Sequence, residues 1–422
     1  MEPVDPRALF TALFEAAVAA ADPRKVISRF LPPRPKGRMI VIGAGKGSAQ
    51  MARAFEEAWD GPLEGVIVTR YGYGVPCRHV EVIEAAHPVP DEAGLRASQR
   101  LFEAVRGLTP DDLVVALISG GGSALLPAPP EHMTLADEIA VNEALLACGA
   151  PISAMNTVRK HLSAIKGGRL AAAAHPAKVV TLVVSDIPGD NPAHVASGPT
   201  VPDDATREDA LRIVETWGLK LPDAAMRHLR SPAADAPKPD DLRFAGNEVH
   251  VIASAALSLE AAAEEARRRG VPAVILSDAI EGEAREVGGV HAAIAREISM
   301  RDRPFRKPVV LLSGGETTVT IRDRGGKGGR NSEFLLSLAL GIDGVEGIHA
   351  FAADTDGIDG SEDNAGAFAD FMSAARMRAA GLDPRAMLAR HDAWTAFNAI
   401  GDLFVPGPTG TNVNDLRSIL VV

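Results

Sequence analysis

Three glycine-rich loops in the sequence have the residue types that bind an anionic ligand. Gly43 to Ser48 reads GAGKGS, Ser119 to Ser123 reads SGGGS, and Ser313 to Glu316 reads SGGE. Each loop follows an apolar run that is typical of a buried strand. Glycine lets the backbone approach a ligand closely, and the free N–H groups in the first turn of a following helix attract anions. We therefore expect phosphate-sized sites at these strand ends, and the two SGG loops could form two walls of one cleft.

Lys46 stands inside the first loop, where packing alone gives little reason for a lysine. The loop is not a Walker A motif, because no glycine stands at Ile40 and Gly47 replaces the serine or threonine that follows the lysine of that motif. We interpret Lys46 as a cation that contacts the ligand.

A dinucleotide-binding fingerprint is only partly present in the same loop. Gly43 and Gly45 match it, but Ser48 stands where the third glycine belongs. The following strand ends in Thr69 and Arg70 instead of the acidic residue that binds an NAD ribose. Because an arginine could contact a 2′-phosphate, NADP binding remains an alternative, and packing of helix on strand is another explanation of the glycines.

Two carboxylates, Asp186 and Asp190, follow the apolar run that ends at Ser185. Carboxylates just past a parallel strand suit a general base or a Mg²⁺ ligand, although aspartate also caps turns. We favour the functional interpretation of this pair.

A second acidic loop follows the predicted strand at 348–353. It contains Asp354, Asp356 and Asp359, but its spacing does not fit an EF-hand, because Asp359 occupies the sixth place, where glycine is required. We expect a Mg²⁺ site or a site for substrate hydroxyls here.

Basic residues are concentrated in two further segments. In a helix predicted over 155–171, Arg159, Lys166 and Arg169 share one face without a nearby acid, which favours anion binding over a solvated basic face. Lys327 and Arg330 stand among glycines at the start of another helix, followed by Asn331. That arrangement suits phosphates, and an exposed hairpin loop is the alternative.

His87 precedes a proline in the loop HPVPDE. It could reach the ligand, but a histidine in a loop more often has a structural role. We expect the structural role.

These residues must be positioned by a chain of 422 residues, which is too long for one ordinary hydrophobic core. The strand at 39–42, the helical pattern after it and the strand at 65–70 form a βαβ unit. This unit predicts a doubly wound α/β sheet that binds ligands beyond the carboxyl ends of its strands. The segment at 231–241, rich in Pro, Ala and Asp, is the expected domain boundary, and a second α/β pattern follows it.

The composition limits the possible partners and compartment. The chain has 44 basic and 55 acidic residues and a net charge of -11, which argues against binding nucleic acid or a membrane surface. No apolar run is long enough to span a bilayer, and the N-terminal stretch resembles an amphipathic helix more than a signal peptide. The 2 cysteines lack metal or redox spacing. We expect a cytoplasmic protein without nucleic-acid or membrane partners.

Taken together, the loops resemble those of the class II glycerate kinases, the family whose C-terminal part is called MOFRL. The matching motifs follow the family order and span nearly the whole chain: GAGKGS, HPVPDE, SGGGSALL, NTVRKHLSAIKGGRLA, SDIPGDNPAHVASGPTVPD, SGGETTVT, GGKGGRNSE, TDGIDGSEDNAGA and GTNVND. The resemblance implies a Rossmann-like α/β domain at 1–235, a MOFRL-type α/β domain at 242–422, and an active site in the cleft between them. It also implies phosphorylation of D-glycerate to 2-phosphoglycerate with ATP and Mg²⁺.

Two other functions remain as alternatives. Some members of the family carry the name hydroxypyruvate reductase, often in connection with tartrate degradation, and that activity would need NAD(P)H. The incomplete fingerprint argues against it. A non-catalytic sugar-acid or nucleotide-binding protein is the third possibility, and both a monomer and a homodimer are compatible with the sequence.

The resemblance implies roles for single residues. Lys46 would steady the transferring phosphoryl group, and Asp186 or Asp190 would orient the glycerate hydroxyl or hold Mg²⁺. The expected ATP-binding residues are Gly43, Gly45, Ser119, Gly120, Gly121, Gly122, Ser123, Gly314, Gly315, Glu316, Lys327, Arg330 and Asn331. The expected substrate-binding residues are Arg159, Lys166, Ser197 and Thr200. The expected metal ligands are Asp354, Asp356 and Asp359.

Overall fold

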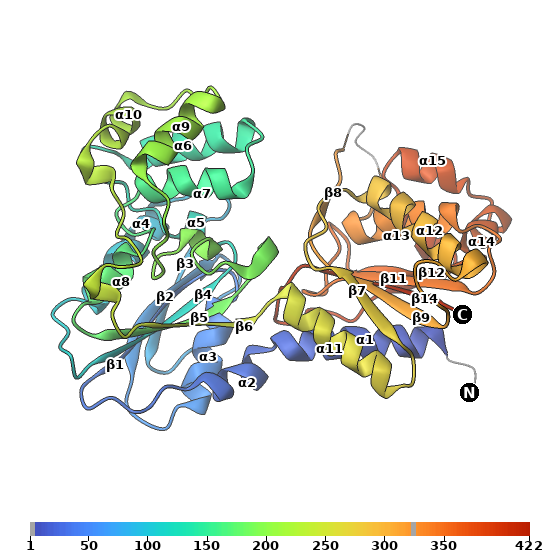
Figure 1. Ribbon diagram of the computed structural model, residues 1–422, viewed down its shortest axis with the longest axis horizontal. Coiled ribbons are helices and arrows are strands. Elements are labelled where there is room, and N and C mark those ends of the chain that lie inside the picture. Colours follow the sequence, from blue (N-terminus) through green and yellow to red (C-terminus); the bar gives the residue numbers. More distant parts are fainter. Residues whose placement is uncertain (1–4, 322–325) are drawn as a thin grey trace. The chain divides into compact units, whose positions relative to one another are not determined.

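The computed structural model describes residues 5–321 and 326–422, and the chain divides into two compact units (Figure 1). The first unit runs from Pro23 to Ile252, and the second joins the residues up to Asp22 to the segment from Ala253 to Val422. This division differs from the boundaries expected from the sequence, 1–235 and 242–422. The strand after the expected boundary joins the first sheet, and the N-terminal helix packs on a helix of the second unit.

The first unit is built on a six-stranded sheet with the order β3-β2-β1-β4-β5-β6 (Figure 1). Its strands are β1 (Met39–Ala44), β2 (Glu64–Arg70), β3 (Val80–Ala85), β4 (Leu113–Ser119), β5 (Lys178–Val184) and β6 (Glu248–Ala253). β1 is parallel to β2 and β4, β2 is parallel to β3, and β4 is parallel to β5. This is the doubly wound order, in which the topological switch point lies between β1 and β4. The predicted fold class of this part of the chain is confirmed.

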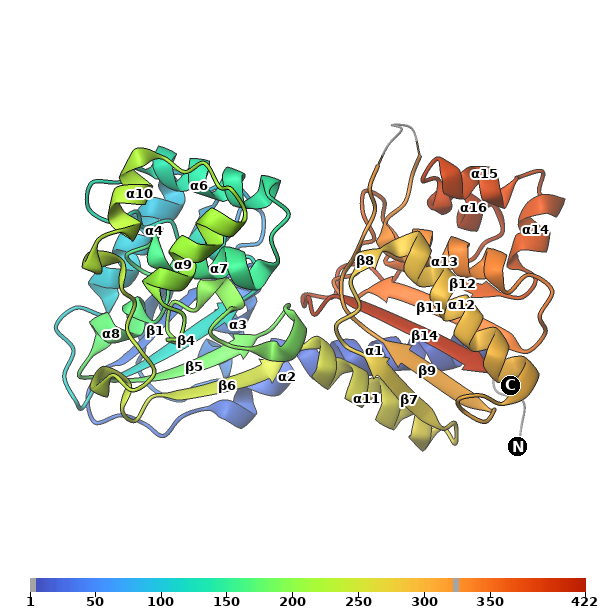
Figure 2. The ribbon, with the colours of Figure 1, turned by 45° about the horizontal axis from the view of Figure 1, so that its top comes forward.

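Helices of the first unit fall into two groups. α3 (Ser48–Ala58), α4 (Glu92–Ala104), the short α5 (Gly122–Leu125) and α8 (Arg169–Ala174) follow or adjoin the strands, and α2 (Pro23–Val26) contacts α3. α6 (Leu135–Ala147), α7 (Ile152–His161), α9 (Arg207–Thr216) and α10 (Asp223–Leu229) form a helical group with a small apolar core of its own. Figure 2 shows this helical group gathered beyond the sheet. The chain therefore adds a helical layer over the edge where ligands are expected.

The helix predicted over 155–171 is interrupted. α7 ends at His161 and α8 begins at Arg169. Gly167 and Gly168 have φ angles of +64° and +81°, and their N–H groups donate to the carbonyls of Ser197 (3.1 Å) and Gly198 (2.7 Å). Because the backbone turns here to bind another loop, the three basic residues of this segment do not share one helix face.

The second unit contains a mixed six-stranded sheet with the order β13-β12-β11-β14-β9-β7. Its strands are β7 (Ala273–Ser277), β9 (Val309–Ser313), β11 (Ile348–Asp354), β12 (Gly366–Asp370), β13 (Leu403–Phe404) and β14 (Asp415–Val421). β14 is antiparallel to both β9 and β11, so its first residue lies at the same edge as the last residues of those two strands. A small ladder joins β8 (Gly282–Glu283) to β10 (Thr317–Thr318).

Helices cover both faces of the second sheet. α1 (Pro6–Ala21) and α11 (Ala255–Arg268) share one apolar core with the sheet. A second core holds α12 (Ala284–Arg301), α13 (Arg330–Gly341), α14 (Ser373–Ala379), α15 (Pro384–Ala389) and α16 (Ala393–Ala399). The result is a three-layer α/β unit, as predicted for this part of the chain. No helix in the two described stretches is both long and apolar enough to cross a bilayer.

Candidate functional site

The loops that follow β1 and β4 pack directly on each other at the switch point of the first sheet. The Lys46 N–H donates to the Gly120 carbonyl (2.8 Å), and the Gly47 N–H donates to Ser119 Oγ (2.9 Å). A Cβ atom at Gly45, where φ is +138°, would lie 2.4 Å from the Ser119 carbonyl oxygen. A Cβ atom at Gly43 would lie 2.5 Å from the Leu117 carbonyl oxygen. The close approach of the β1 and β4 segments is therefore sufficient to explain why glycine stands at both positions.

Lys46 and Asp186 meet at the SGGG loop, from the ends of β1 and β5. A Cβ atom built on Gly121 would lie 3.0 Å from Lys46 Cε, and one built on Gly120 would lie 1.8 Å from Asp186 Oδ2. Lys46 is half-buried, and its ammonium group makes no ion pair with any carboxylate of the described residues. A lysine without a counter-ion beside a glycine loop can accept an anionic ligand without first breaking an internal contact.

Asp190, the second predicted catalytic carboxylate, lies in a different environment. It ends the short 3₁₀ turn η2 (Pro188–Asp190) with a φ angle of 50°. Within the described stretches its carboxylate makes no hydrogen bond and no ion pair. The structure places only Asp186 against the SGGG loop, so Asp186 is the stronger of the two candidates.

A chain of polar side chains connects the start of α5 to Arg159. Ser123 Oγ lies 2.7 Å from Ser197 Oγ, and Ser197 Oγ donates to Asn156 Oδ1 (3.0 Å). Arg159 Nη1 donates to the same Asn156 oxygen (3.4 Å), and its Nε donates to Asn142 Oδ1 (2.9 Å). The structure thus brings three predicted residues, Ser123, Arg159 and Ser197, into one network.

Arg159 is a cation without a counter-ion in this network. Burial lowers the pKa of its guanidinium below the ordinary value, although the charge of Glu138 opposes this effect. No carboxylate lies within ion-pair distance of Arg159 in the described part of the chain. Because arginine keeps its proton in proteins, a half-buried guanidinium held only by two amide oxygens is suited to a carboxylate or phosphate ligand.

The sequence did not indicate Asn156 and Asn142, which orient Arg159. Asn156 is buried (2% exposed) and also donates to the His194 carbonyl (3.2 Å). It stands three residues before Arg159 in α7, a spacing that places two helical side chains next to each other. This spacing was the signal in the sequence that could have linked Asn156 to Arg159. It is not specific, because asparagine forms hydrogen bonds with many kinds of groups.

Lys166 and Thr200 have structural contacts instead of the predicted substrate contacts. Lys166 is 1% exposed, and its Nζ donates to Glu138 Oε1 (2.9 Å) and to the Leu126 carbonyl (2.7 Å). Thr200 is 3% exposed and accepts a hydrogen bond from Thr181 Oγ1 (3.0 Å). Because its ammonium group is buried in an ion pair with Glu138, Lys166 cannot contact a ligand. Its positive charge instead holds α6 in place through Glu138.

In the second unit, Arg330 lies at the edge where β11 ends and β14 begins. Its Nε donates to Asp415 Oδ1 (2.8 Å), its Nη2 donates to Asp354 Oδ2 (2.7 Å), and its Nη1 lies 3.3 Å from Glu316 Oε1. Burial alone would lower the pKa of this guanidinium, but the three carboxylates raise it above the ordinary value. Burial also raises the pKa of Asp354, against the effect of Arg330. Phosphate oxygens at Arg330 would have to compete with these carboxylates.

The predicted metal ligands are not arranged around a common point. Asp359 Oδ1 and Oδ2 accept hydrogen bonds from the Asn331 N–H (2.9 Å) and the Ser332 N–H (2.8 Å), so this carboxylate caps α13. Asp354 binds Arg330, and Asp356 Oδ1 accepts from the Ile358 N–H (2.8 Å). Within residues 5–321 and 326–422, no group of three or more His, Cys, Asp or Glu side chains is placed to hold a metal ion.

Other predicted nucleotide residues of this unit also have structural contacts. A Cβ atom at Gly315 would lie 2.3 Å from the Ile280 nitrogen, and the Gly314 carbonyl accepts from Arg417 (3.1 Å). Asn331 is fully buried and donates to Asp415 Oδ1 (2.8 Å). Lys327 is exposed, 4.9 Å from the centre of a tryptophan ring, and Gly325 of the same GGKGGRNSE motif lies outside the described residues. Among the predicted nucleotide-binding residues of this unit, Glu316 and Arg330 line a cavity.

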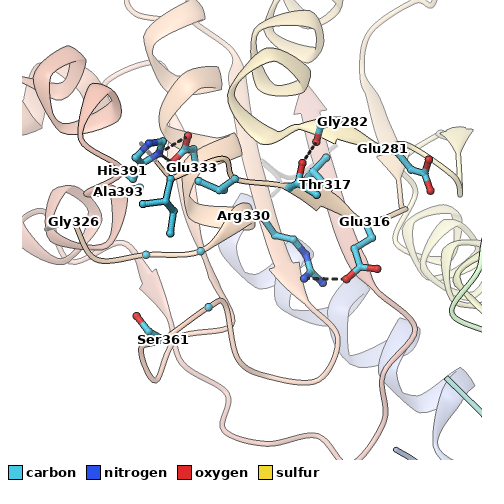
Figure 3. A pocket seen from close by; sticks show the side chains of 16 residues that line it. Glu281, Gly282, Glu316, Thr317, Gly326, Arg330, Glu333, Ser361, His391 and Ala393 are labelled. Carbon is cyan, nitrogen blue, oxygen red and sulfur yellow. Dashed lines mark hydrogen bonds and ion pairs between the residues drawn. The ribbon is translucent and has the colours of Figure 1, made fainter. Parts of the chain in front are cut away.

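That cavity has a volume of about 970 Å³ and belongs entirely to the second unit (Figure 3). Glu316 and Arg330 lie on one side of it, and the pair Glu333 and His391 lies on another (Figure 3). His391 Nδ1 is 3.0 Å from Glu333 Oε2, and Arg285 donates to Glu333 Oε1 (2.6 Å). The wall therefore combines carboxylates with hydroxyls of Thr317, Thr318 and Ser361 and the apolar side chains of Val319, Ile321 and Ala393.

Comparison with known proteins identifies both halves of the chain. Residues 9–230 match the family described as Domain of unknown function (DUF4147), and residues 309–415 match the MOFRL family. A protein of Agrobacterium vitis that is provisionally named a hydroxypyruvate reductase is 55% identical, covering 99% of this chain and 95% of its own. The glycerate 2-kinase of Pyrococcus horikoshii is 43% identical, covering 92% of this chain and 88% of its own.

The fold is also shared with a solved structure. A crystal structure of a glycerate kinase from Thermotoga maritima is 39% identical to this chain, covers 99% of both chains and has a TM-score of 0.90. The resemblance of the loops is thus supported over the full length of the chain. The chain belongs to the class II glycerate kinase family, in which a DUF4147 domain precedes a MOFRL domain.

Proposed function

We propose that this chain is a glycerate 2-kinase that transfers the γ-phosphoryl group of ATP to the 2-hydroxyl group of D-glycerate. The observation that carries the proposal is the Lys46 side chain, which makes no ion pair with a carboxylate of the described residues and lies with Asp186 against the glycines of the SGGG loop. Phosphoryl transfer needs positioned charges around the moving group more than covalent chemistry. The names of the relatives from Pyrococcus horikoshii and Thermotoga maritima support this assignment.

Arg159 is the residue that we propose for the glycerate carboxylate. A guanidinium binds a carboxylate through two parallel hydrogen bonds, and Arg159 has N–H groups left over after its contacts with the two asparagines. Ser123 lies in the same network and is our candidate for a hydroxyl group of the substrate, whereas Ser197 is fully buried and holds Ser123 and Asn156. This set favours a small hydroxy acid over a larger anion.

Lys46 and Asp186 supply the chemistry in this proposal. As the glycerate oxygen forms its bond to the γ-phosphorus, the bond from that phosphorus to the bridging oxygen of ADP breaks, and Lys46 neutralises charge on the phosphoryl oxygens. The hydroxyl proton passes to the Asp186 carboxylate. Mg²⁺ often binds through one or two carboxylates together with substrate phosphates, so Asp186 also fits a metal carried by ATP, which would neutralise phosphate oxygens.

The cavity of the second unit is a separate candidate site for a small ligand, and we propose a nucleoside as its occupant. Its volume of about 970 Å³ lies within the range of small-molecule sites. Glu316 and Thr318 offer hydrogen-bonding groups for a ribose, and Val319 and Ala393 offer apolar contacts for a base. If Thr318→Trp, which adds bulk at an exposed position of the cavity wall, leaves the affinity for ADP unchanged in a calorimetric titration, the nucleoside binds elsewhere.

A second candidate function is hydroxypyruvate reduction. It is favoured by the name of the Agrobacterium vitis relative and by the doubly wound strand order, which also binds dinucleotides. Two assays on one purified sample separate the candidates: ADP formation with Mg-ATP and D-glycerate, and loss of NAD(P)H with hydroxypyruvate. We expect glycerate-dependent ADP formation and no loss of NAD(P)H, and the reverse result would select the reductase.

A further inference from the structure

His87 lies at the same glycine as Lys46, although it comes from a different loop. It follows β3 and precedes α4, whereas Lys46 follows β1. A Cβ atom built on Gly121 would lie 3.1 Å from His87 Nε2 and 3.0 Å from Lys46 Cε. The imidazole and the lysine side chain therefore both lie against the SGGG loop. A purely structural role for His87, as expected from the sequence, gives no reason for its ring to lie beside Lys46.

The His87 ring has unused hydrogen-bonding capacity. It is half-buried, and neither ring nitrogen makes a hydrogen bond or ion pair within residues 5–321 and 326–422. A structural histidine in the same chain behaves differently: the ring nitrogens of His291 lie 2.8 Å from the Val287 carbonyl oxygen and 3.0 Å from Ser313 Oγ. Because the ring is half-buried and not bonded to other described residues, its nitrogens are available to a ligand or to water.

The charges around His87 determine its protonation state. Burial, followed by the charges of Lys46 and Arg70, lowers the pKa of His87 to about 4. Asp186 lies against Gly120, the neighbouring glycine of the same loop. At neutral pH the ring is therefore uncharged and carries one N–H donor and one acceptor nitrogen. A neutral donor can bind an anionic oxygen beside Lys46 without adding a repelling positive charge.

We propose that His87 contacts the substrate directly, with its Nε2–H donating a hydrogen bond to a phosphoryl oxygen that Lys46 also holds. This inference rests on the proposed kinase function. In this proposal Lys46 and His87 bind the phosphoryl group, and Arg159 binds the carboxylate of glycerate. His87 then joins Lys46 in stabilising charge that develops during transfer.

The experiment compares His87→Ala with His87→Gln, whose side-chain amide can place a donor near the position of Nε2. We expect His87→Ala to lower kcat at least about thirtyfold while KM for glycerate changes less than about threefold. The Gln variant should regain at least about a third of wild-type kcat. The control is His79→Ala, because His79 is exposed on the same unit. A kcat for His87→Ala close to that of the wild type would overturn the proposal, as would equal losses in both variants with a lowered Tm.

Nuclear magnetic resonance of ¹⁵N-histidine-labelled wild-type protein provides an independent measurement. We expect 2-phosphoglycerate and inorganic phosphate to shift the His87 Nε2 resonance, while the His79 resonances remain in place. A shifted resonance in a protein that does not phosphorylate glycerate would contradict the proposed function and support the His87 contact. An unshifted resonance in an active kinase would reject the His87 contact alone.

Discussion

Lys46 stands at the switch point of the first sheet, and its ammonium group makes no ion pair within the two described stretches of the chain. Lys46 is held in place by its own backbone, since its N–H donates to Gly120 and its carbonyl accepts from Thr69. The ammonium group is therefore available to a ligand, at the end of a side chain whose backbone is fixed. Such preorganised charge lowers the barrier to phosphoryl transfer because no counter-ion has to leave first.

Lys46→Ala should therefore lower kcat for glycerate phosphorylation at least about a hundredfold. The fold should be unaffected, because the ammonium group makes no ion pair with any residue that the structure describes. Steady-state kinetics with a circular-dichroism spectrum measures both properties, and Lys36→Ala is the matched control because Lys36 is exposed. A folded Lys46→Ala variant with nearly wild-type turnover would exclude the catalytic role.

Arg159→Gln should raise KM for glycerate at least about tenfold, because the variant loses the charge that is proposed to bind the carboxylate. KM for ATP should change less than about twofold. Initial rates at varied concentrations of each substrate separate the two effects. Arg212→Gln, at a side chain that is 69% exposed, should change neither value. An equal rise in both KM values would point to a general disturbance of α7.

For single residues, the sequence placed Lys46 and Asp186 after apolar strands whose ends meet at one edge of the sheet, and the structure brings both side chains to the SGGG loop. Their catalytic roles stay predictions. The sequence did not indicate the structural contact of Lys166, whose partner Glu138 lies 28 residues away in α6. The predicted metal ligand Asp359 is likewise used within the fold, since its carboxylate caps the helix that begins at Arg330. A charged residue in a sequence does not reveal whether the fold supplies its counter-ion.

At the scale of elements, apolar runs and glycines predicted the strands and loops of the first sheet well. The prediction of a helix over 155–171 was wrong, because helical periodicity continues across Gly167 and Gly168 while the backbone turns to bind Ser197 and Gly198. Those two partners lie about 30 residues further along the chain, a contact that periodicity cannot indicate. The turn nevertheless matters for the site, since it fixes Ser197 beside Ser123.

His291 connects α12 to β9 and should make the second unit sensitive to acid. Burial lowers its pKa from 6.5 to about 4, so between these values the unfolded chain binds a proton that the native protein does not. The free energy of unfolding should thus fall as the pH decreases from 6.5 towards 4, by up to about 3 kcal/mol from this residue.

Urea unfolding of the wild type and of His291→Gln at pH 7.5, 6 and 5 tests this expectation. The variant should be less stable at pH 7.5, because it disturbs the contacts with Val287 and Ser313, but it should lose less stability on acidification. His79→Gln should follow the wild type. Parallel pH profiles for all three proteins would show that His291 does not titrate as described.

At the scale of the whole molecule, the two ends of the chain are folded together. Phe10 of α1 stacks on Phe351 of β11 with ring centres 5.9 Å apart, and Phe14 contacts Phe404 at 5.0 Å. The sequence predicted the amphipathic helix but could not identify its partner, because the apolar face of a helix fits many apolar surfaces. The N-terminal helix therefore belongs structurally to the unit that contains the MOFRL match.

Phe10→Ala should lower the free energy of unfolding of the second unit by about 3 to 5 kcal/mol, because Phe10 is 1% exposed and its removal leaves a cavity. Hydrogen exchange should show faster exchange in β11 and α11, with little change in β1 and β4. The control is Met300→Ala, at a residue that is 54% exposed. Faster exchange confined to the first sheet would contradict the placement of α1.

The most direct test of kinase function is phosphorus NMR of the purified protein with Mg-ATP and D-glycerate, with NAD(P)H and hydroxypyruvate in a parallel sample. We predict that the resonance of 2-phosphoglycerate grows as ATP is consumed, that Lys46→Ala suppresses it, and that the NAD(P)H absorbance stays constant. If NAD(P)H is oxidised and no phosphoglycerate forms, the chain is not a glycerate kinase.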